Sequence, residues 1–209
     1  MSTAPAAPPA APAGAGFDGS ISRLPAMLAH NARFVREGDY RDFAVASPAP
    51  AVRCVVLTCM DSRLVHLLPA ALDIKQGEAM IIKTAGAMLS HAFGGIMRSV
   101  IVALYELRAS EVFIIGHDDC GMRSINPAVT KEKMLRAGVP ADRLATLKSA
   151  GIDVDRWLEG FSSVDESVLA SVNVLRSHPL VPAGLRVTGL IIDPVSGALR
   201  EPAAGAHAH

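Results

Sequence analysis

Two cysteines and a histidine follow two apolar segments, and together these three side chains could hold a metal ion. Cys59 comes two residues after the β-branched segment 51–57, and His117 and Cys120 follow the similar segment 111–115. Such segments are typical of buried strands, and open α/β sheets bind their ligands at the strand ends. A Cys2His set suits zinc with one coordination position left open. The sequence therefore predicts zinc on Cys59, His117 and Cys120.

A carboxylate and a guanidinium stand beside the first of these cysteines. Asp61 and Arg63 lie two and four residues after Cys59. The ordinary interpretation of such a pair is a solvated salt bridge. Next to zinc, however, Asp61 could accept a hydrogen bond from a metal-bound water or ligate the metal itself, and Arg63 could hold the carboxylate in a bidentate pair. Cys54 lies among Val and Leu residues, and we expect it to be a core residue.

Strand-like and helix-like segments alternate along the chain, which predicts an α/β fold with a mostly parallel β-sheet flanked by helices. Asp18 or Ser20 could cap the first helix, which we expect to be an arm. The expected strands are 51–57, 79–83, 111–115 and 185–193. The expected helices are 21–37, 91–107, 153–158 and 163–176, with one or two helices over 130–148 that break at 138–140. Residues 62–71 predict a short helix or an irregular turn.

The composition excludes several classes of protein. The 209 residues include 20 basic and 20 acidic side chains and only 4% aromatic residues, so neither a nucleic acid nor an anionic membrane is an expected partner. No apolar stretch has the ~20 residues needed to span a bilayer, and the N-terminus lacks the pattern of a signal peptide. Three cysteines cannot form a disulfide framework in a chain of this size. We expect a cytoplasmic protein.

The chain is expected to carry one domain between two tails. Residues 1–16 are nearly all Ala, Pro and Gly, and they predict a disordered tail. Residues 17–200 are expected to form a single zinc-binding catalytic domain with an N-terminal helical arm. Residues 201–209 are rich in Ala, Gly and His, and they predict a flexible tail.

The motifs around these candidate residues resemble the β-class carbonic anhydrases, in particular their short prokaryotic branch. The resemblance covers residues 21–199, and its most specific part is the pair C-x-D-x-R and H-x-x-C. One departure is visible, since the family has Asn after a basic residue where this chain has Lys83 and Thr84. The matching segments are 59–63 (CMDSR), 83–87 (KTAGA), 116–122 (GHDDCGM), 178–180 (HPL) and 189–194 (GLIIDP).

The resemblance implies a carbonate dehydratase, which is a zinc lyase with one zinc per chain on Cys59, His117 and Cys120. It implies that Asp61 and Arg63 are the catalytic dyad and that the chain forms a homodimer or homotetramer. The implied reaction is the reversible hydration of CO2 to bicarbonate and a proton by zinc-bound hydroxide. Three further side chains, His66, His91 and Asp118, are candidate proton shuttles, although each is more often an ordinary surface residue.

Two other functions stay open. Carbonyl sulfide and carbon disulfide hydrolases resemble the same family and would share its zinc site. A catalytically silent, zinc-binding regulatory protein is the second alternative, and it would require Asp61 to close the fourth position permanently, because structural zinc sites normally use a fourth Cys or His. A thiol redox protein is disfavoured, since the sequence has no C-x-x-C motif.

Overall fold

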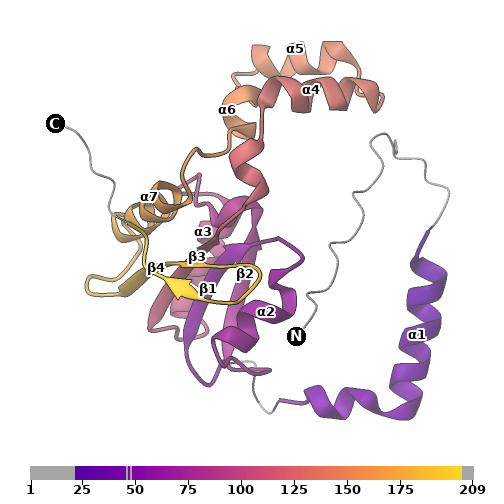
Figure 1. The fold of residues 1–209 in the computed structure, drawn as a ribbon, viewed down its shortest axis with the longest axis vertical. Helices are drawn as coiled ribbons and strands as arrows, with labels where there is room; N and C mark the ends of the chain where they lie inside the picture. The colour runs from indigo at the N-terminus through magenta and orange to yellow at the C-terminus, as the bar shows by residue number, and fades with distance from the viewer. Residues whose placement is uncertain (1–21, 46, 48, 204–209) are drawn as a thin grey trace, which may run out of the picture. The chain divides into compact units, whose positions relative to one another are not determined.

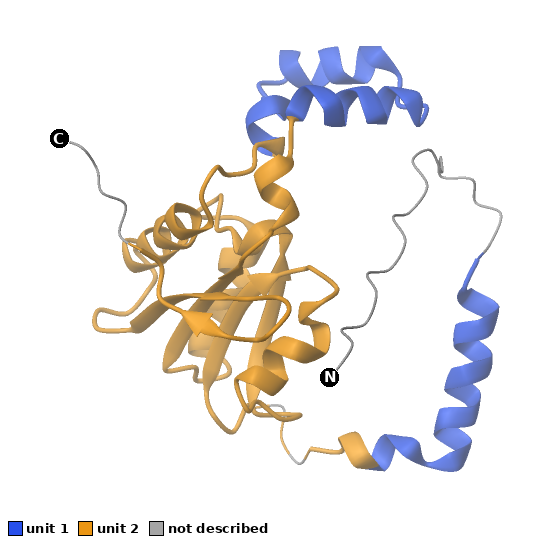
Figure 2. Cartoon of the chain, in the orientation of Figure 1, with its two compact units in different colours: residues 1–41, 127–157 blue, residues 42–126, 158–209 orange. Residues whose placement is uncertain are grey.

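A computed structural model describes residues 22–45, 47 and 49–203. Both candidate caps of the first helix and the expected 1–16 tail lie outside the described residues, as do residues 204–209 of the second tail. The chain divides into two compact units, Met1–Arg41 with Pro127–Trp157 and Asp42–Asn126 with Leu158–His209 (Figure 2). A single domain over 17–200 stays a prediction.

The second unit is built on a five-stranded sheet with the order β2-β1-β3-β4-β5 (Figure 1). All neighbouring strands are parallel except β4 and β5, which pair antiparallel. The predicted α/β class with a mostly parallel sheet is therefore confirmed. The strands are β1 (Cys54–Cys59), β2 (Ala79–Thr84), β3 (Glu111–His117), β4 (Arg186–Ile192) and β5 (Leu199–Arg200).

Helices cover both faces of this sheet. The helices α3 (Gly95–Tyr105) and α7 (Val164–Arg176) contribute Met97, Val100, Val168 and Val172 to one buried cluster with β1 and β3. On the other face, α2 (Leu64–Ala71) buries Leu64 and Leu68 against the same strands. Parallel strands that are buried on both faces become nearly continuous apolar runs, which explains the strand signals in the sequence.

Several element boundaries differ from the predicted ones. β1 begins at Cys54 and includes Cys59, so the first cysteine ligand candidate is the last residue of the strand rather than two residues beyond it. Cys54 begins this strand instead of lying in its middle, although it is buried as expected. The predicted helix 91–107 begins only at Gly95, because Gly94 is extended. Ser163 caps α7 by accepting a hydrogen bond from the amide of Glu166.

The described residues of the first unit form helices in which no residue is buried. The helix α1 (Leu24–Glu37) ends at Gly38, whose φ is +81°. The predicted helical stretch 130–148 forms two helices, α4 (Pro127–Arg136) and α5 (Ala141–Ser149), which are separated at the expected break at 138–140. The short α6 (Val154–Leu158) follows. None of the described helices is long and apolar enough to cross a membrane.

Candidate metal centre

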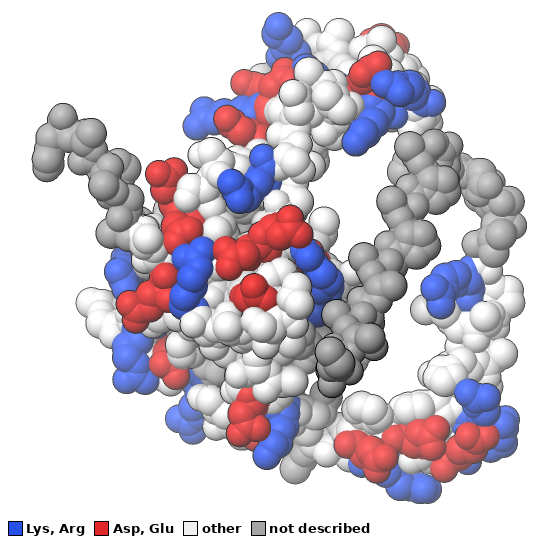
Figure 3. Space-filling model, in the orientation of Figure 1, with Lys and Arg blue, Asp and Glu red and all other residues white. Residues whose placement is uncertain are grey.

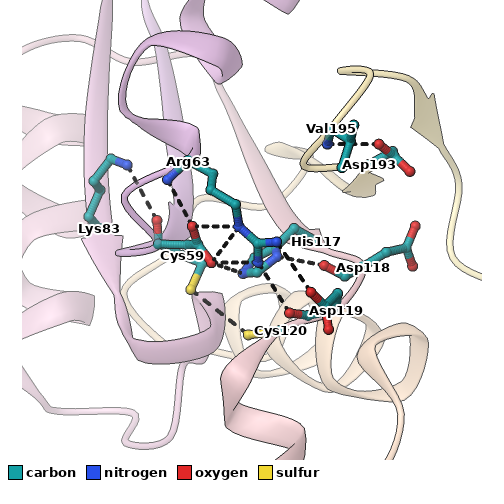
Figure 4. Close-up of polar contacts among 10 residues, drawn as sticks. Cys59, Arg63, Lys83, His117, Asp118, Asp119, Cys120, Asp193 and Val195 are labelled. Carbon is teal, nitrogen blue, oxygen red and sulfur yellow. Dashed lines mark hydrogen bonds and ion pairs between the residues drawn. The ribbon is translucent and has the colours of Figure 1, made fainter. Parts of the chain in front are cut away.

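The three predicted ligands meet at the carboxyl edge of the sheet. Cys59 ends β1, His117 ends β3, and Cys120 follows three residues later. All three are buried, and one sulfur or nitrogen atom of each lies within 4.8 Å of those of the other two. The two sulfur atoms are 3.9 Å apart (Figure 4). Two neighbouring parallel strands thus deliver three soft or borderline donors to one point, which is a set that could hold a metal ion.

The imidazole of His117 has one partnered nitrogen and one orphan. Its Nδ1 lies 2.8 Å from the backbone carbonyl oxygen of Asp118, and a carbonyl can only accept, so Nδ1 carries the proton. Its Nε2 is buried and has no hydrogen-bond partner among the described residues. An unpaired buried nitrogen is costly unless it binds something. The lone pair on Nε2 therefore fits a metal ion, and so does the thiol pair beside it.

The two cysteines of this cluster, Cys59 and Cys120, differ in acidity. Burial acts against the charged form of Cys59, but nearby His117 and the backbone amides of Asp61 and Gly86 outweigh burial and lower the pKa of Cys59 to about 7. Burial, with the neighbouring Cys59 charge, raises the pKa of Cys120 to about 11. In the absence of a metal ion, one thiol thus keeps its proton at neutral pH, and a cation must displace that proton on binding.

Arg63 holds the carboxylate of Asp61 in place. Its Nη2 donates to Oδ2 at 2.8 Å, and its Nε donates to Oδ1 at 3.1 Å, while its backbone amide also donates to Oδ1 at 2.8 Å. Hydrogen bonding to Arg63 lowers the pKa of Asp61 to about 2. Oδ2 of Asp61 lies 3.8 Å from Nε2 of His117. The carboxylate is therefore charged, engaged with Arg63, and adjacent to the possible metal position.

A tight loop after β2 packs beside the cysteines. Gly86 has φ +71°, and a Cβ there would lie 2.9 Å from side-chain atoms of both Met122 and Phe161. Only glycine fits both the conformation and the space. Lys83 Nζ donates to the carbonyl oxygen of Cys59 at 3.4 Å, whereas the hydroxyl of Thr84 is buried without a hydrogen-bond partner among the described residues. The backbone of Thr84 instead accepts from the amide of Met60 at 2.7 Å.

The structure adds Asp119 and Arg200 to the residues near the centre and places the three candidate proton shuttles. Arg63 also donates to Oδ2 of Asp119 at 3.2 Å, and Asp119 has φ +53°. Asp118, a candidate proton shuttle, forms an ion pair with Arg200 at 2.9 Å. The other two shuttle candidates, His66 and His91, are exposed. Asp118 and Arg200 are 82 positions apart in the sequence, so their contact leaves no local pattern from which it could have been predicted.

Comparisons with known proteins identify a family. A family model described as carbonic anhydrase matches residues 54–199. "Putative carbonic anhydrase YvdA" of Bacillus subtilis (strain 168) is 48% identical over 176 residues, which are 84% of this chain and 89% of that protein. "Carbon disulfide hydrolase" of Acidianus sp. (strain A1-3) is 29% identical over 166 residues, or 72% of this chain and 77% of that protein.

Among solved structures, a β-carbonic anhydrase of Trichomonas vaginalis superimposes with a TM-score of 0.78 at 30% sequence identity. The match covers 86% of this chain and 97% of that one.

Proposed function

Because the chain belongs to the β-carbonic anhydrase family, we propose that it is a zinc-dependent carbonic anhydrase that interconverts CO2 and bicarbonate. The observation that carries the proposal is the buried cluster of Cys59, His117 and Cys120, with its orphan imidazole nitrogen beside a carboxylate held by Arg63. The cluster would contribute three ligands, and no fourth Cys or His joins it among the residues that the structure describes. This is the donor pattern of a catalytic rather than a structural zinc site.

We propose that Cys59, His117 and Cys120 hold one zinc ion per chain. Zinc would supply the Lewis acidity that makes water a nucleophile near neutral pH. His117 binds through Nε2, because its Nδ1 proton is committed to the carbonyl oxygen of Asp118. Two thiolates would balance the charge of the ion. The acidity of a water bound there would therefore depend more on nearby hydrogen-bond acceptors than it does in an all-histidine zinc site.

Asp61 and Arg63 form the proposed catalytic dyad. Arg63 engages both oxygens of Asp61 and so orients the carboxylate instead of leaving it to ligate the metal. Oδ1 already accepts two hydrogen bonds from Arg63, so Oδ2, which accepts one short bond and faces His117, is the oxygen that can accept a hydrogen bond from the reacting water. A fixed acceptor selects one orientation of that water, which leaves its oxygen lone pair free to attack carbon.

The proposal extends to assembly and location. We propose a homodimer or homotetramer, supported by the exposed apolar side chains of Leu24, Met27 and Leu28 on α1 and by the tetrameric β-carbonic anhydrases of Sordaria macrospora among the structural neighbours. We also propose a cytoplasmic location, which is supported by three cysteines that are all free.

One alternative has its own support. Four relatives at 28–30% identity are carbon disulfide hydrolases. An enzyme of that kind would use the same metal ligands and differ in the shape of its substrate pocket. The closer similarity to the Bacillus proteins favours CO2 as the substrate.

A parallel assay of both substrates separates these functions. Zinc-quantified protein is tested for CO2 hydration by stopped flow and for sulfide release from carbon disulfide and carbonyl sulfide. We expect CO2 hydration well above the buffer rate and no comparable sulfide release. Sulfide release with little hydration would establish the alternative. Full zinc content with neither activity would leave the regulatory protein as the function.

A further inference from the structure

Asp118 and Asp119 form a short loop that connects the two proposed ligands His117 and Cys120. Asp119 in this loop adopts φ +53°, a left-handed conformation that costs energy for a residue other than glycine. A strained backbone keeps such a conformation only when its surroundings hold it there. The relative position of His117 and Cys120 therefore depends on the contacts that hold this loop.

One arginine holds Asp119 from the β1 side. Arg63 donates from Nη1 to Oδ2 of Asp119 at 3.2 Å and from Nη2 to its carbonyl oxygen at 3.3 Å. The same guanidinium holds Asp61, so this contact belongs to the proposed dyad.

A second arginine holds Asp118 from the opposite side. Arg200, on the short strand β5, donates from Nη2 to Oδ1 of Asp118 at 2.9 Å. The carbonyl oxygen of Asp118 accepts the Nδ1 proton of His117, and its amide donates to the carbonyl oxygen of Ile192 at 3.1 Å. In Figure 4, the carbonyl of Asp118 meets the imidazole while its carboxylate points away from the two sulfur atoms. Asp118 thus links the imidazole, through its backbone carbonyl, to Arg200, through its carboxylate.

Arg200 is itself held by a third carboxylate. Its Nη1 and Nη2 donate to the two oxygens of Asp165 at 2.7 and 3.3 Å, and the amide of Ala203 donates to Oδ1 of Asp165 at 2.8 Å. Acidic and basic side chains lie next to one another on the visible face of this unit (Figure 3). Arg200 bridges α7, β5 and the ligand loop, so it differs from an exposed ion pair that joins two flexible side chains.

We propose that Arg200 is a positioning residue of the metal centre, which fixes the imidazole of His117 through the carboxylate and the backbone carbonyl of Asp118. The inference rests on the proposed zinc site. An exposed ion pair contributes little to stability by itself, but a group that orients a ligand histidine can change metal affinity about 10- to 100-fold. Arg200 contacts the histidine only through Asp118, so its effect should be smaller, and its loss should raise the rate of zinc release on the order of fivefold.

The test follows the release of zinc from the loaded protein into an excess of chelator, detected with a zinc indicator. Arg200→Ala and Asp118→Ala should each release zinc about fivefold faster than the parent. The double variant should be no faster than either single variant, because both changes remove the same connection. Arg200→Lys, which can reach only one carboxylate at a time, should lie between the parent and Arg200→Ala.

A matched control comes from the other end of the sheet. Arg186 forms an exposed ion pair with Glu111 at 3.4 Å, on β4 and β3, and touches no candidate ligand. Arg186→Ala should release zinc at the parent rate. Unfolding of the metal-free proteins in denaturant measures any general loss of stability, and it should be similar for Arg186→Ala and Arg200→Ala. The cobalt-substituted proteins give a second readout, since a displaced imidazole changes the visible spectrum of Arg200→Ala but not of Arg186→Ala.

The outcomes separate the two proposals. Zinc release from Arg200→Ala at the rate of Arg186→Ala would overturn the positioning role, even if the parent hydrates CO2. Effects of the two single variants that multiply in the double variant would overturn the route through Asp118. A parent that holds zinc without hydrating CO2 would refute the proposed function, while faster release from Arg200→Ala would still support positioning. If Arg200→Ala does not fold, Asp118→Ala and Arg200→Lys decide the question against the same control.

Discussion

The chemistry of single residues explains why the three cysteines of this chain should behave differently. Cys59 and Cys120 lie 3.9 Å apart at the strand ends, whereas Cys54 lies in the core at the start of β1. Burial raises the pKa of the Cys54 thiol, which keeps that thiol protonated. Only Cys59 and Cys120 should therefore act as thiolate ligands.

Substitution of each cysteine should separate these roles. Cys59→Ser, Cys120→Ser and His117→Ala should each reduce zinc from about one per chain to about a tenth or less, because a site with two protein ligands binds weakly. Cys54→Ser should keep full zinc and lose only packing. Metal analysis after gel filtration measures the amount of zinc per chain. Full zinc in any of the first three variants removes that residue from the ligand set.

The Asp61–Arg63 pair should act as a switch at the fourth coordination position. In Arg63→Ala the freed carboxylate, whose Oδ2 lies only 3.8 Å from Nε2 of His117, should bind the metal and close the site. In Asp61→Ala the position stays open, but the reacting water loses its acceptor. Both variants should keep zinc and lose hydration activity on the order of 100-fold. X-ray absorption should show four protein ligands only in Arg63→Ala, and near-parental turnover there would reduce the pair to a structural salt bridge.

The pH dependence of this pair has a definite sign. Hydrogen bonding to Arg63 lowers the pKa of Asp61 to about 2, so the pair contributes stability above the unfolded value of ~3.9 and loses that contribution as the pH falls through about 2. Asp61 is therefore fully charged from pH 6 to 9, and a rise in activity across that range must report another group. Asp61→Asn should lower the rate and move the midpoint of the pH profile, because it removes the charged acceptor on which the acidity of the reacting water depends, and an unmoved midpoint at the parental rate would contradict this role.

At the level of elements, two glycines let α7 approach the sheet closely. A Cβ on Gly189 of β4 would lie 2.7 Å from Val168 Cγ1, and one on Gly116 of β3 would lie 2.8 Å from Val168 Cγ2. Valine on a helix has one preferred rotamer, so the helix itself would have to move. The position of α7 matters to the site, since its Asp165 holds Arg200.

Gly189→Ala should consequently lower the free energy of unfolding by about 1–3 kcal/mol through overpacking. Gly95→Ala is the control, because nothing lies within 4 Å of a Cβ at that position in the first turn of α3. Denaturant unfolding of the two variants gives the comparison. Equal stability of Gly189→Ala and the parent would show that α7 does not depend on this close approach.

The elements that were predicted well are those with a strong local pattern. Buried parallel strands appear as apolar runs, and the three candidate ligands lie at the ends of two of these strands or just after them, so the sheet and the candidate ligands were both accessible from the sequence. β5 has two residues and exposed side chains, and it leaves no such pattern. Arg200 lies on that strand, and its partners Asp118 and Asp165 are far away in sequence. Its role depends on tertiary contacts and could not be predicted.

For the whole molecule, the feature that bears on assembly is a row of exposed apolar side chains on α1. None of the residues of α1, all of which the structure describes, is buried, and Leu24, Met27 and Leu28 are about 60% exposed at helical spacing. Such a stripe is typical of a helix that packs against something. A second copy of the chain is the partner we propose.

Light scattering at micromolar concentration should therefore give a dimer or tetramer. Leu24→Glu with Leu28→Glu should shift the protein to a smaller species, because charges on this stripe oppose its burial. Arg36→Glu changes charge on the same helix without touching the stripe, and it should leave the assembly unchanged. A parent mass of 21.9 kDa, that of one chain, would contradict the proposed oligomer.

The central claim, that one zinc ion on Cys59, His117 and Cys120 makes this protein a carbonic anhydrase, is tested most directly by a zinc titration of activity. Metal-free protein is loaded in steps, and the stopped-flow rate of CO2 hydration is measured at each step. The account predicts a rate that rises in proportion to bound zinc and stops rising at about one zinc per chain. A fully loaded protein that hydrates CO2 no faster than the buffer, or a metal-free protein that is already active, would contradict it.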